Sequence, residues 1–234
     1  MPIRETPAAG LRFQIASDQS LLVYFGDGIA PETHRQVVKM LRLLQSQPIA
    51  GVRDLHPAYA SLLINFNCFT LAHDELEAVL RQYFDRVKDI PLPEPKHVEI
   101  PVCYGGEFGP DLADVAAAHG IAPSRVIDLH VSAEYFVYFL GFAPGFAYLG
   151  GLPAEIATPR LAAPRKRVPA GSVGIAGNQT AVYPFHTPGG WRLIGRTPVS
   201  LFRSDRQQMS LLTIGDVVRF KPISVEHFAE LAKS

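Results

Sequence analysis

The sequence predicts a small α+β domain followed by a mainly-β domain, on three observations. The chain has 234 residues, more than the roughly 100–150 residues typical of one domain. Up to residue 90, short apolar runs alternate with two helical patterns, which is typical of a sheet covered by helices. Beyond that point glycine and proline become frequent, which favours many turns and short strands, as in a barrel or a sandwich.

The first ninety residues carry the order strand, strand, helix, strand, strand, helix. Short apolar or alternating runs bounded by turn residues predict four strands. These cover residues 11–16, 20–25, 50–56 and 60–66. Pro31 begins a run with apolar residues at helical spacing, which ends before Pro48, and a second such run begins near Asp74. The sequence therefore predicts a small sheet with two helices over one face.

A proline-rich segment separates the two predicted domains. Residues 91–96 contain three prolines at alternate positions, and such a segment favours an extended, semi-rigid connection. We therefore predict an α+β domain over residues 1–90, a linker over 91–96 and the mainly-β domain over 97–234. In the second domain, residues 98–102 alternate as a strand does, and a following helix is expected to stop at Gly120.

The overall composition excludes several classes of function. Twenty-two basic and twenty-two acidic residues give a formal charge of zero, so neither nucleic acid nor an anionic membrane is an expected partner. The N-terminus lacks the apolar segment of a signal peptide, and no run approaches the ~20 apolar residues of a membrane span. We therefore expect a cytoplasmic protein. Cys68 and Cys103 alone make neither a disulfide framework nor a zinc site, so no metal is expected.

Residues 141–198 form a basic segment that suggests an anion site. They include ten glycines, eight prolines, six basic residues and a single acid, Glu155. The basic residues are Arg160, Arg165, Lys166, Arg167, Arg192 and Arg196. Guanidinium groups and glycine N–H groups both suit carboxylate or phosphate, although a solvated basic face is the simpler alternative. Arg165 is predicted to be a surface residue, so that its loss should leave stability almost unchanged.

Three glycines spaced by three, Gly171, Gly174 and Gly177, lie inside this segment and precede Asn178 and Gln179. The pattern matches neither the phosphate loop nor the dinucleotide fingerprint. The glycine N–H groups are candidates for holding an oxyanion, and the two amides are candidates for binding an amide or a carboxylate. A turn closed by Asn178 is an equally good interpretation.

Two further residues are candidates for proton transfer or binding. His186 lies among turn formers and aromatic residues and is able to move a proton near neutral pH. Glu107 lies between glycines, where a carboxylate can act as a base or bind an ammonium or amide group. For both residues, a plain solvated side chain is the alternative. The aromatics of residues 141–153 either line a pocket or fill one end of the barrel, and core filling is expected for at least one of them.

Four short strings in the second half resemble the sequence blocks of one family. They are PVCYGG at 101–106, GFAPGFAYL at 141–149, PAGSVGIAG at 169–177 and PGGW at 188–191. In this order the strings resemble the family of 5-oxoprolinase B-subunits. That family overlaps the KipI kinase inhibitors and the carboxyltransferase domains of allophanate hydrolase subunit 1.

The resemblance implies a fold, an activity and partners. The C-terminal domain would be a cyclophilin-like barrel, and the chain would be one component of a multi-subunit, ATP-dependent 5-oxoprolinase that converts 5-oxo-L-proline, a small-molecule substrate, to L-glutamate. The partners would be the homologous C-subunit and an A-subunit, and the assembled complex would hold ATP with magnesium. Asn178, His186 and Arg165 would be catalytic, while Arg160 and Lys166 would steady phosphate or the substrate carboxylate.

The resemblance leaves two other functions open. A KipI-type protein would inhibit a sensor histidine kinase through the barrel surface. A carboxyltransferase component would need carboxybiotin, and the chain contains no Met-Lys-Met biotinylation site, so biotin would have to arrive on another protein.

Overall fold

The computed structural model describes residues 10–233, which divide into two compact units. The first unit ends at Glu94 and the second begins at Pro95, so the division falls inside the proline-rich segment 91–96. No helix within residues 10–233 is long and apolar enough to cross a bilayer.

The N-terminal unit is built on a four-stranded antiparallel sheet in the order β1-β2-β4-β3. The strands are β1 (Arg12–Ser17), β2 (Ser20–Tyr24), β3 (Val52–Pro57) and β4 (Ser61–Phe66). In β2 and β4, buried residues such as Leu21 and Ile64 alternate with half-buried ones, so one face of the sheet carries the core. The predicted order of strands and helices is confirmed.

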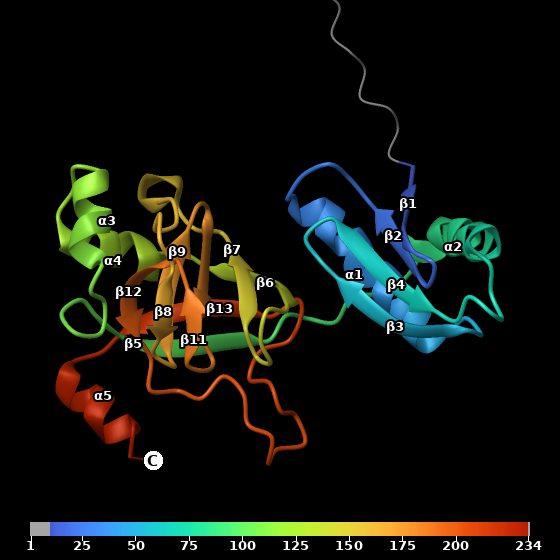
Figure 1. The fold of residues 1–234 in the computed structure, drawn as a ribbon. Helices are drawn as coiled ribbons and strands as arrows, with labels where there is room; N and C mark the ends of the chain where they lie inside the picture. The colour runs from blue at the N-terminus through green and yellow to red at the C-terminus, as the bar shows by residue number, and fades with distance from the viewer. Residues whose placement is uncertain (1–9, 234) are drawn as a thin grey trace, which may run out of the picture. The chain divides into compact units, whose positions relative to one another are not determined.

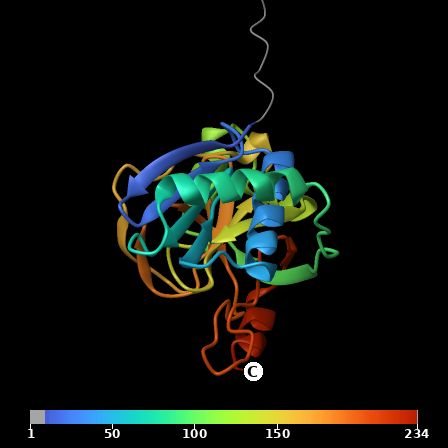
Figure 2. The same ribbon diagram turned by 90° about the vertical axis from the view of Figure 1, so that its right-hand side faces the viewer.

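Two helices cover that apolar face, α1 (Pro31–Ser46) and α2 (His73–Val87). In α1, the apolar residues Val37, Met40 and Leu44 recur at helical spacing and are all buried. Glu75 accepts a hydrogen bond from the N–H of Ala72 at 2.9 Å and so caps the start of α2. Figure 2 shows α2, in teal, crossing in front of α1, in blue, and the two helices pack together.

The second unit contains a closed barrel with the strand order β10-β7-β6-β13-β5-β12-β9, seen at the left of Figure 1. Its strands are β5 (His97–Tyr104), β6 (Tyr135–Leu140), β7 (Ala147–Gly150), β9 (Ser172–Ala176), β10 (Gln179–Val182), β12 (Arg192–Arg196) and β13 (Val217–Pro222). A separate two-stranded ribbon pairs β8 (Arg165–Val168) with β11 (Thr187–Gly189). The predicted α+β unit followed by a barrel is confirmed.

Short helices complete the second unit: α3 (Leu112–Ala118), α4 (Pro123–Ser132), the 3₁₀ turn η1 (Ala154–Ile156) and α5 (Val225–Leu231). As predicted, the helix α3 stops before Gly120, whose φ of 64° lies in the left-handed region. The glycine-rich segment 141–198 folds into short strands, turns and η1, as its composition predicts.

A buried chain of hydrogen bonds crosses the barrel core at His130, on α4. The Tyr104 hydroxyl lies 2.8 Å from His130 Nδ1, and Thr180 Oγ1 lies 3.1 Å from His130 Nε2. Thr180 Oγ1 in turn donates to the Gly174 carbonyl at 3.0 Å. Since the Thr180 hydrogen is directed at Gly174, Nε2–H of His130 donates to Thr180, and Nδ1 accepts from Tyr104. Both ring nitrogens therefore have partners, and the imidazole is neutral.

Candidate functional site

The three predicted cradle glycines do not meet at one point. Gly171 and Gly177 flank β9, so six residues at ~3.3 Å each place them about 20 Å apart. The N–H of Gly171 donates to the Tyr183 carbonyl at 2.7 Å, and that of Gly177 to the Thr158 carbonyl at 2.8 Å. Gly174 lies inside β9, between β10 and β12. The prediction of a backbone oxyanion cradle is therefore corrected, because these N–H groups already have partners and the strand separates the glycines.

The glycines instead allow close packing. A side chain at Gly171, which has a φ of +80°, would overlap the carbonyl oxygen of Thr197, and one at Gly174 would press on Trp191 Cβ at 3.1 Å. Glycine is thus the residue that lets β9 lie close against its neighbours.

The other polar candidates are spread over the barrel. Asn178 is exposed in the turn between β9 and β10, where the alternative turn interpretation places it, and Gln179 begins β10. His186 is exposed beyond the other end of β10, just before β11. Glu107 is exposed in the loop after β5, near Cys103, whose thiol pKa is raised by burial and then by the carboxylates of Glu226 and Glu107. The structure does not bring Asn178 and His186 together.

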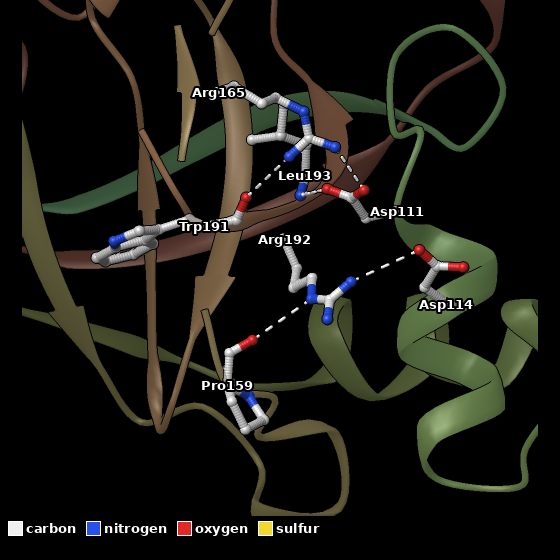
Figure 3. A network of polar contacts seen from close by, with 7 residues as sticks. All are labelled: Asp111, Asp114, Pro159, Arg165, Trp191, Arg192 and Leu193. Atoms are coloured by element: carbon white, nitrogen blue, oxygen red, sulfur yellow. Dashed lines mark hydrogen bonds and ion pairs between the residues drawn. The ribbon is translucent and has the colours of Figure 1, made fainter. Parts of the chain in front are cut away.

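Arg165 is held by the buried carboxylate of Asp111, which no motif in the sequence indicates. Its Nη2 donates to Asp111 Oδ1 at 2.6 Å, and its Nη1 donates to the Trp191 carbonyl at 3.5 Å (Figure 3). Asp111 Oδ2 accepts the Leu193 N–H at 2.7 Å. The Asp111 side chain is only 6% exposed and that of Arg165 29%. The prediction that Arg165 is a plain surface arginine is wrong, because its charge compensates a buried carboxylate.

Two more arginines of the basic segment have partners within the protein. Arg192 Nη1 lies 3.6 Å from Asp114 Oδ2 on α3, and its Nε donates to the Pro159 carbonyl at 3.4 Å (Figure 3). Arg196 Nε donates to the Ala170 carbonyl at 2.8 Å. Two acids outside residues 141–198, Asp111 and Asp114, therefore offset part of the positive charge of that segment. The exposed basic side chains that remain are Arg160, Lys166 and Arg167.

Arg160 lies over a cluster of aromatic rings, which we call the aromatic platform. The platform comprises Phe146, Tyr148, Tyr183 and Trp191. The Arg160 guanidinium carbon is 5.7 Å from the Trp191 ring centroid, a cation–π distance. The other three rings pack edge-on to Trp191 at centroid distances of 5.7, 6.4 and 6.4 Å. The platform thus combines a buried aromatic base with one exposed cation.

Among the aromatics of residues 141–153, the structure shows core filling at one ring. Phe146, Tyr183 and Trp191 are 5% exposed or less and form a second small core. Core filling by at least one aromatic of residues 141–153 is therefore confirmed at Phe146. Tyr148 is half-buried and Arg160 is exposed, so these two residues give the platform its accessible edge.

Burial shifts the pKa of the platform phenols further above neutral pH. It raises the pKa of Tyr148, and the charge of Arg160 opposes that rise. It also raises the pKa of Tyr183, where a backbone hydrogen bond with Trp191 and the charge of Arg160 act in the opposite direction. At neutral pH both phenols are therefore O–H groups beside a guanidinium. A cation next to neutral hydrogen-bond donors is an arrangement that suits a small carboxylate.

Residues 10–233 form neither a metal-binding cluster nor the predicted glycine cradle. Within residues 10–233, no group of three or more His, Cys, Asp or Glu side chains is placed to hold a metal ion. Cys68 and Cys103 are both free thiols. Because the N–H groups of Gly171 and Gly177 donate to backbone carbonyls, the glycine segment does not fit the phosphates of a nucleotide.

A two-domain chain with this barrel belongs to the class of carboxyltransferase domains. The family model for "Carboxyltransferase domain, subdomain C and D" matches residues 11–212. Within this class, the 5-oxoprolinase B-subunit of Bacillus subtilis is 42% identical over 93% of this chain and 96% of its own length. The 5-oxoprolinase B-subunit of Escherichia coli is 54% identical over 65% of this chain and 69% of its own length. The chain belongs to the family of 5-oxoprolinase B-subunits, as the four sequence blocks predict.

Solved structures agree with the fold. The crystal structure of TTHA0988 superposes with a TM-score of 0.77 at 35% identity and covers 88% of this chain. This chain spans only 40% of the TTHA0988 chain. The urea amidolyase of Kluyveromyces lactis superposes with a TM-score of 0.81 over 100% of this chain and 16% of that one. At 19% identity, the latter match shows a shared fold alone.

Proposed function

We propose that this chain is the B-subunit of an ATP-dependent 5-oxoprolinase, which opens the lactam of 5-oxo-L-proline to give L-glutamate. The observation that carries the proposal is the 42% identity with the Bacillus subtilis protein, which extends over 93% of this chain and 96% of that protein. The chain would act with the homologous C-subunit and with an A-subunit. We place the assembly in the cytoplasm, where ATP is available.

The aromatic platform is the part of this chain that we assign to the substrate. 5-Oxo-L-proline is a small, nearly flat lactam ring that carries one carboxylate. Arg160 would pair with the carboxylate while the ring lies against the accessible edge of the platform at Tyr148. The protonated phenol of Tyr148 is a donor suited to a lactam oxygen. Lys166, which is exposed, is a second candidate for the carboxylate.

We assign ATP and its magnesium to the assembled complex. The support is the lack of fit described above, since the glycine N–H groups are used inside the barrel. When bound, ATP would activate the lactam, whose amide is otherwise a poor electrophile. This chain would contribute substrate binding and orientation, and exposed His186 remains a candidate for proton transfer only if a partner protein completes its surroundings.

The proposal is tested by reconstitution. The purified chain alone should show no 5-oxoproline-dependent ATP hydrolysis, and mixing it with the C- and A-subunits should produce both ADP and glutamate. Robust turnover by the isolated chain would contradict the division of labour, and a complete mixture that associates yet opens no lactam would overturn the function.

Arg160→Ala tests the platform within the active mixture. Losing a charge-assisted contact to a carboxylate should lower kcat/KM about 10- to 100-fold, which corresponds to about 1.5–3 kcal/mol. Arg167→Ala is the matched control, because Arg167 is an exposed arginine of the same segment on β8. If Arg160→Ala and Lys166→Ala both keep wild-type kinetics, the substrate does not bind at the platform.

A further inference from the structure

One end of the barrel exposes apolar side chains on three loops. Phe142 is 63% exposed, Phe185 39% and Met209 49%. Phe142 lies between β6 and β7, Phe185 between β10 and β11, and Met209 between β12 and β13. In Figure 1 the β6–β7 loop and the long β12–β13 segment lie at the lower end of the barrel. Exposed apolar side chains that gather in this way mark interaction surfaces.

Contacts of Phe202 bring the three loops together at this end of the barrel. The Phe185 and Phe202 rings are 5.7 Å apart. Phe202 pairs with Ser210, next to Met209. Gly145 packs against Phe202 so closely that a side-chain carbon there would lie 2.8 Å from Phe202 Cβ. We call the set Phe142, Phe185, Phe202 and Met209 the aromatic rim.

The backbone holds Phe142 outward at a conformational cost. Its φ of 65° is the one positive value among the non-glycine residues that the structure describes, and the left-handed region is unfavourable for a residue with a Cβ. A tight turn fixes this geometry: the Ala143 N–H donates to the Gly141 carbonyl at 2.7 Å, and the Gly141 N–H donates to the Phe146 carbonyl at 3.0 Å. The turn therefore holds the phenyl ring with one edge against Phe146, at a centroid distance of 5.3 Å, while most of its apolar surface stays exposed.

The loops that carry the rim have one more basic than acidic residue. The loops 141–146, 183–186 and 200–210 contain two arginines, Arg203 and Arg206, and one acid, Asp205. Arg203 pairs with Asp205 at 2.8 Å, so the charge of Arg206 is left uncompensated within these loops. Exposed phenylalanine and methionine bordered by arginine is the composition typical of protein interfaces.

We propose that the aromatic rim docks the C-subunit through an apolar segment of that protein bordered by acidic side chains. The proposal rests on the proposed function, which requires a partner protein. The composition of the rim supports an interface, and the charge of Arg206 is the reason why we expect acidic side chains on the partner. The TTHA0988 structure adds support, because this unit makes up 40% of a longer chain there and thus occurs joined to further protein.

Phe142→Gly provides the cleanest test. Glycine adopts a positive φ freely, so the variant removes the ring while keeping the turn. Its thermal stability should stay close to that of the wild type, because relief of the backbone strain offsets the lost contact with Phe146. Binding of the purified C-subunit, measured by titration calorimetry, should weaken at least tenfold for Phe142→Gly and further for Phe142→Gly with Phe185→Ser. Arg206→Glu should also weaken binding, more at low salt than at high salt.

Phe69→Ser is the matched control. Phe69 is 92% exposed in the N-terminal unit and lies outside the rim, so this variant should bind the C-subunit as the wild type does. If the rim variants bind the C-subunit normally while the reconstituted enzyme is active, the docking proposal is overturned and the proposed function stands. If the wild-type mixture neither associates nor opens 5-oxoproline, the proposed function fails. If the rim variants abolish only self-association of this chain in sedimentation, the occupant is a second copy, which also overturns the proposal.

Discussion

Acid should destabilise the barrel through His130. Burial lowers the pKa of this imidazole from 6.5 to about 3. Its two nitrogens already have partners, with Nε2–H directed to Thr180 and Nδ1 accepting from Tyr104. A second proton on the ring would face the Tyr104 hydroxyl and would lie in an apolar core, stacked 4.5 Å from the Phe220 ring. His130 therefore binds a proton less readily in the folded barrel than in the unfolded chain.

The size and sign of the effect follow from the two pKa values. As the pH falls below 6.5, the unfolded state takes up the proton first, so stability is lost between pH 6.5 and about 3 and is constant above that window. Each unit of pH within the window costs about 1.4 kcal/mol. The loss should therefore reach about 2 kcal/mol at pH 5.

Urea unfolding followed by tryptophan fluorescence measures this loss. Trp191 is the only tryptophan in the sequence and is 5% exposed inside the second unit, so the signal reports the unfolding of the barrel in the full chain. His130→Gln removes the titration while keeping a donor and an acceptor, and should lose about 2 kcal/mol less than the wild type between pH 7 and pH 5. His227→Gln, at an exposed histidine on α5, should behave as the wild type. Equal losses in wild type and His130→Gln would show that protonation of this imidazole does not cause the acid destabilisation.

Three further predictions concern stability and domain structure. Arg165→Ala should lower the free energy of unfolding by about 1–3 kcal/mol, because it leaves the buried Asp111 carboxylate without its cation; thermal unfolding checks this, with exposed Lys166→Ala as the control that should change little. Gly109→Ala should destabilise the barrel by more than roughly 1 kcal/mol, because the new methyl group would overlap a β12 carbonyl oxygen; an unchanged melting temperature would contradict this contact. Limited proteolysis should cut first within residues 91–96 and release a C-terminal fragment with native Trp191 fluorescence; a first cut within 141–198 would place the boundary elsewhere.

Local periodicity is enough to predict the N-terminal unit. Alternation in a strand and helical spacing in an amphipathic helix are properties of neighbouring residues, so both can be recognised in a short window. The closed order of the barrel has no such local signal. β13 pairs in parallel with β5, with Val217 opposite His97, and no pattern within either strand specifies a partner so distant in sequence.

The same limit explains the errors at the candidate site. A charge summed over residues 141–198 leaves out Asp111, the partner of Arg165, which lies 54 residues before it. The regular spacing of the three glycines suggests that they form one site. In the structure, strand β9 runs from the first to the third and keeps them apart. The aromatic platform draws rings from three separate segments around Arg160, so the string 141–149 indicates only part of it in advance.

The pairing of β13 with β5 has a consequence for how the protein is made on the ribosome. β13 lies between β5 and β6, so both strands keep an open edge until the chain has been synthesised through Pro222. The N-terminal unit, whose last helix ends at Val87, has all its elements much earlier. A nascent or truncated chain that stops before Val217 would carry one finished unit and one barrel with two unpaired edges, which are templates for aggregation. Nonsense mutations late in the gene should therefore yield insoluble protein rather than a shorter working protein.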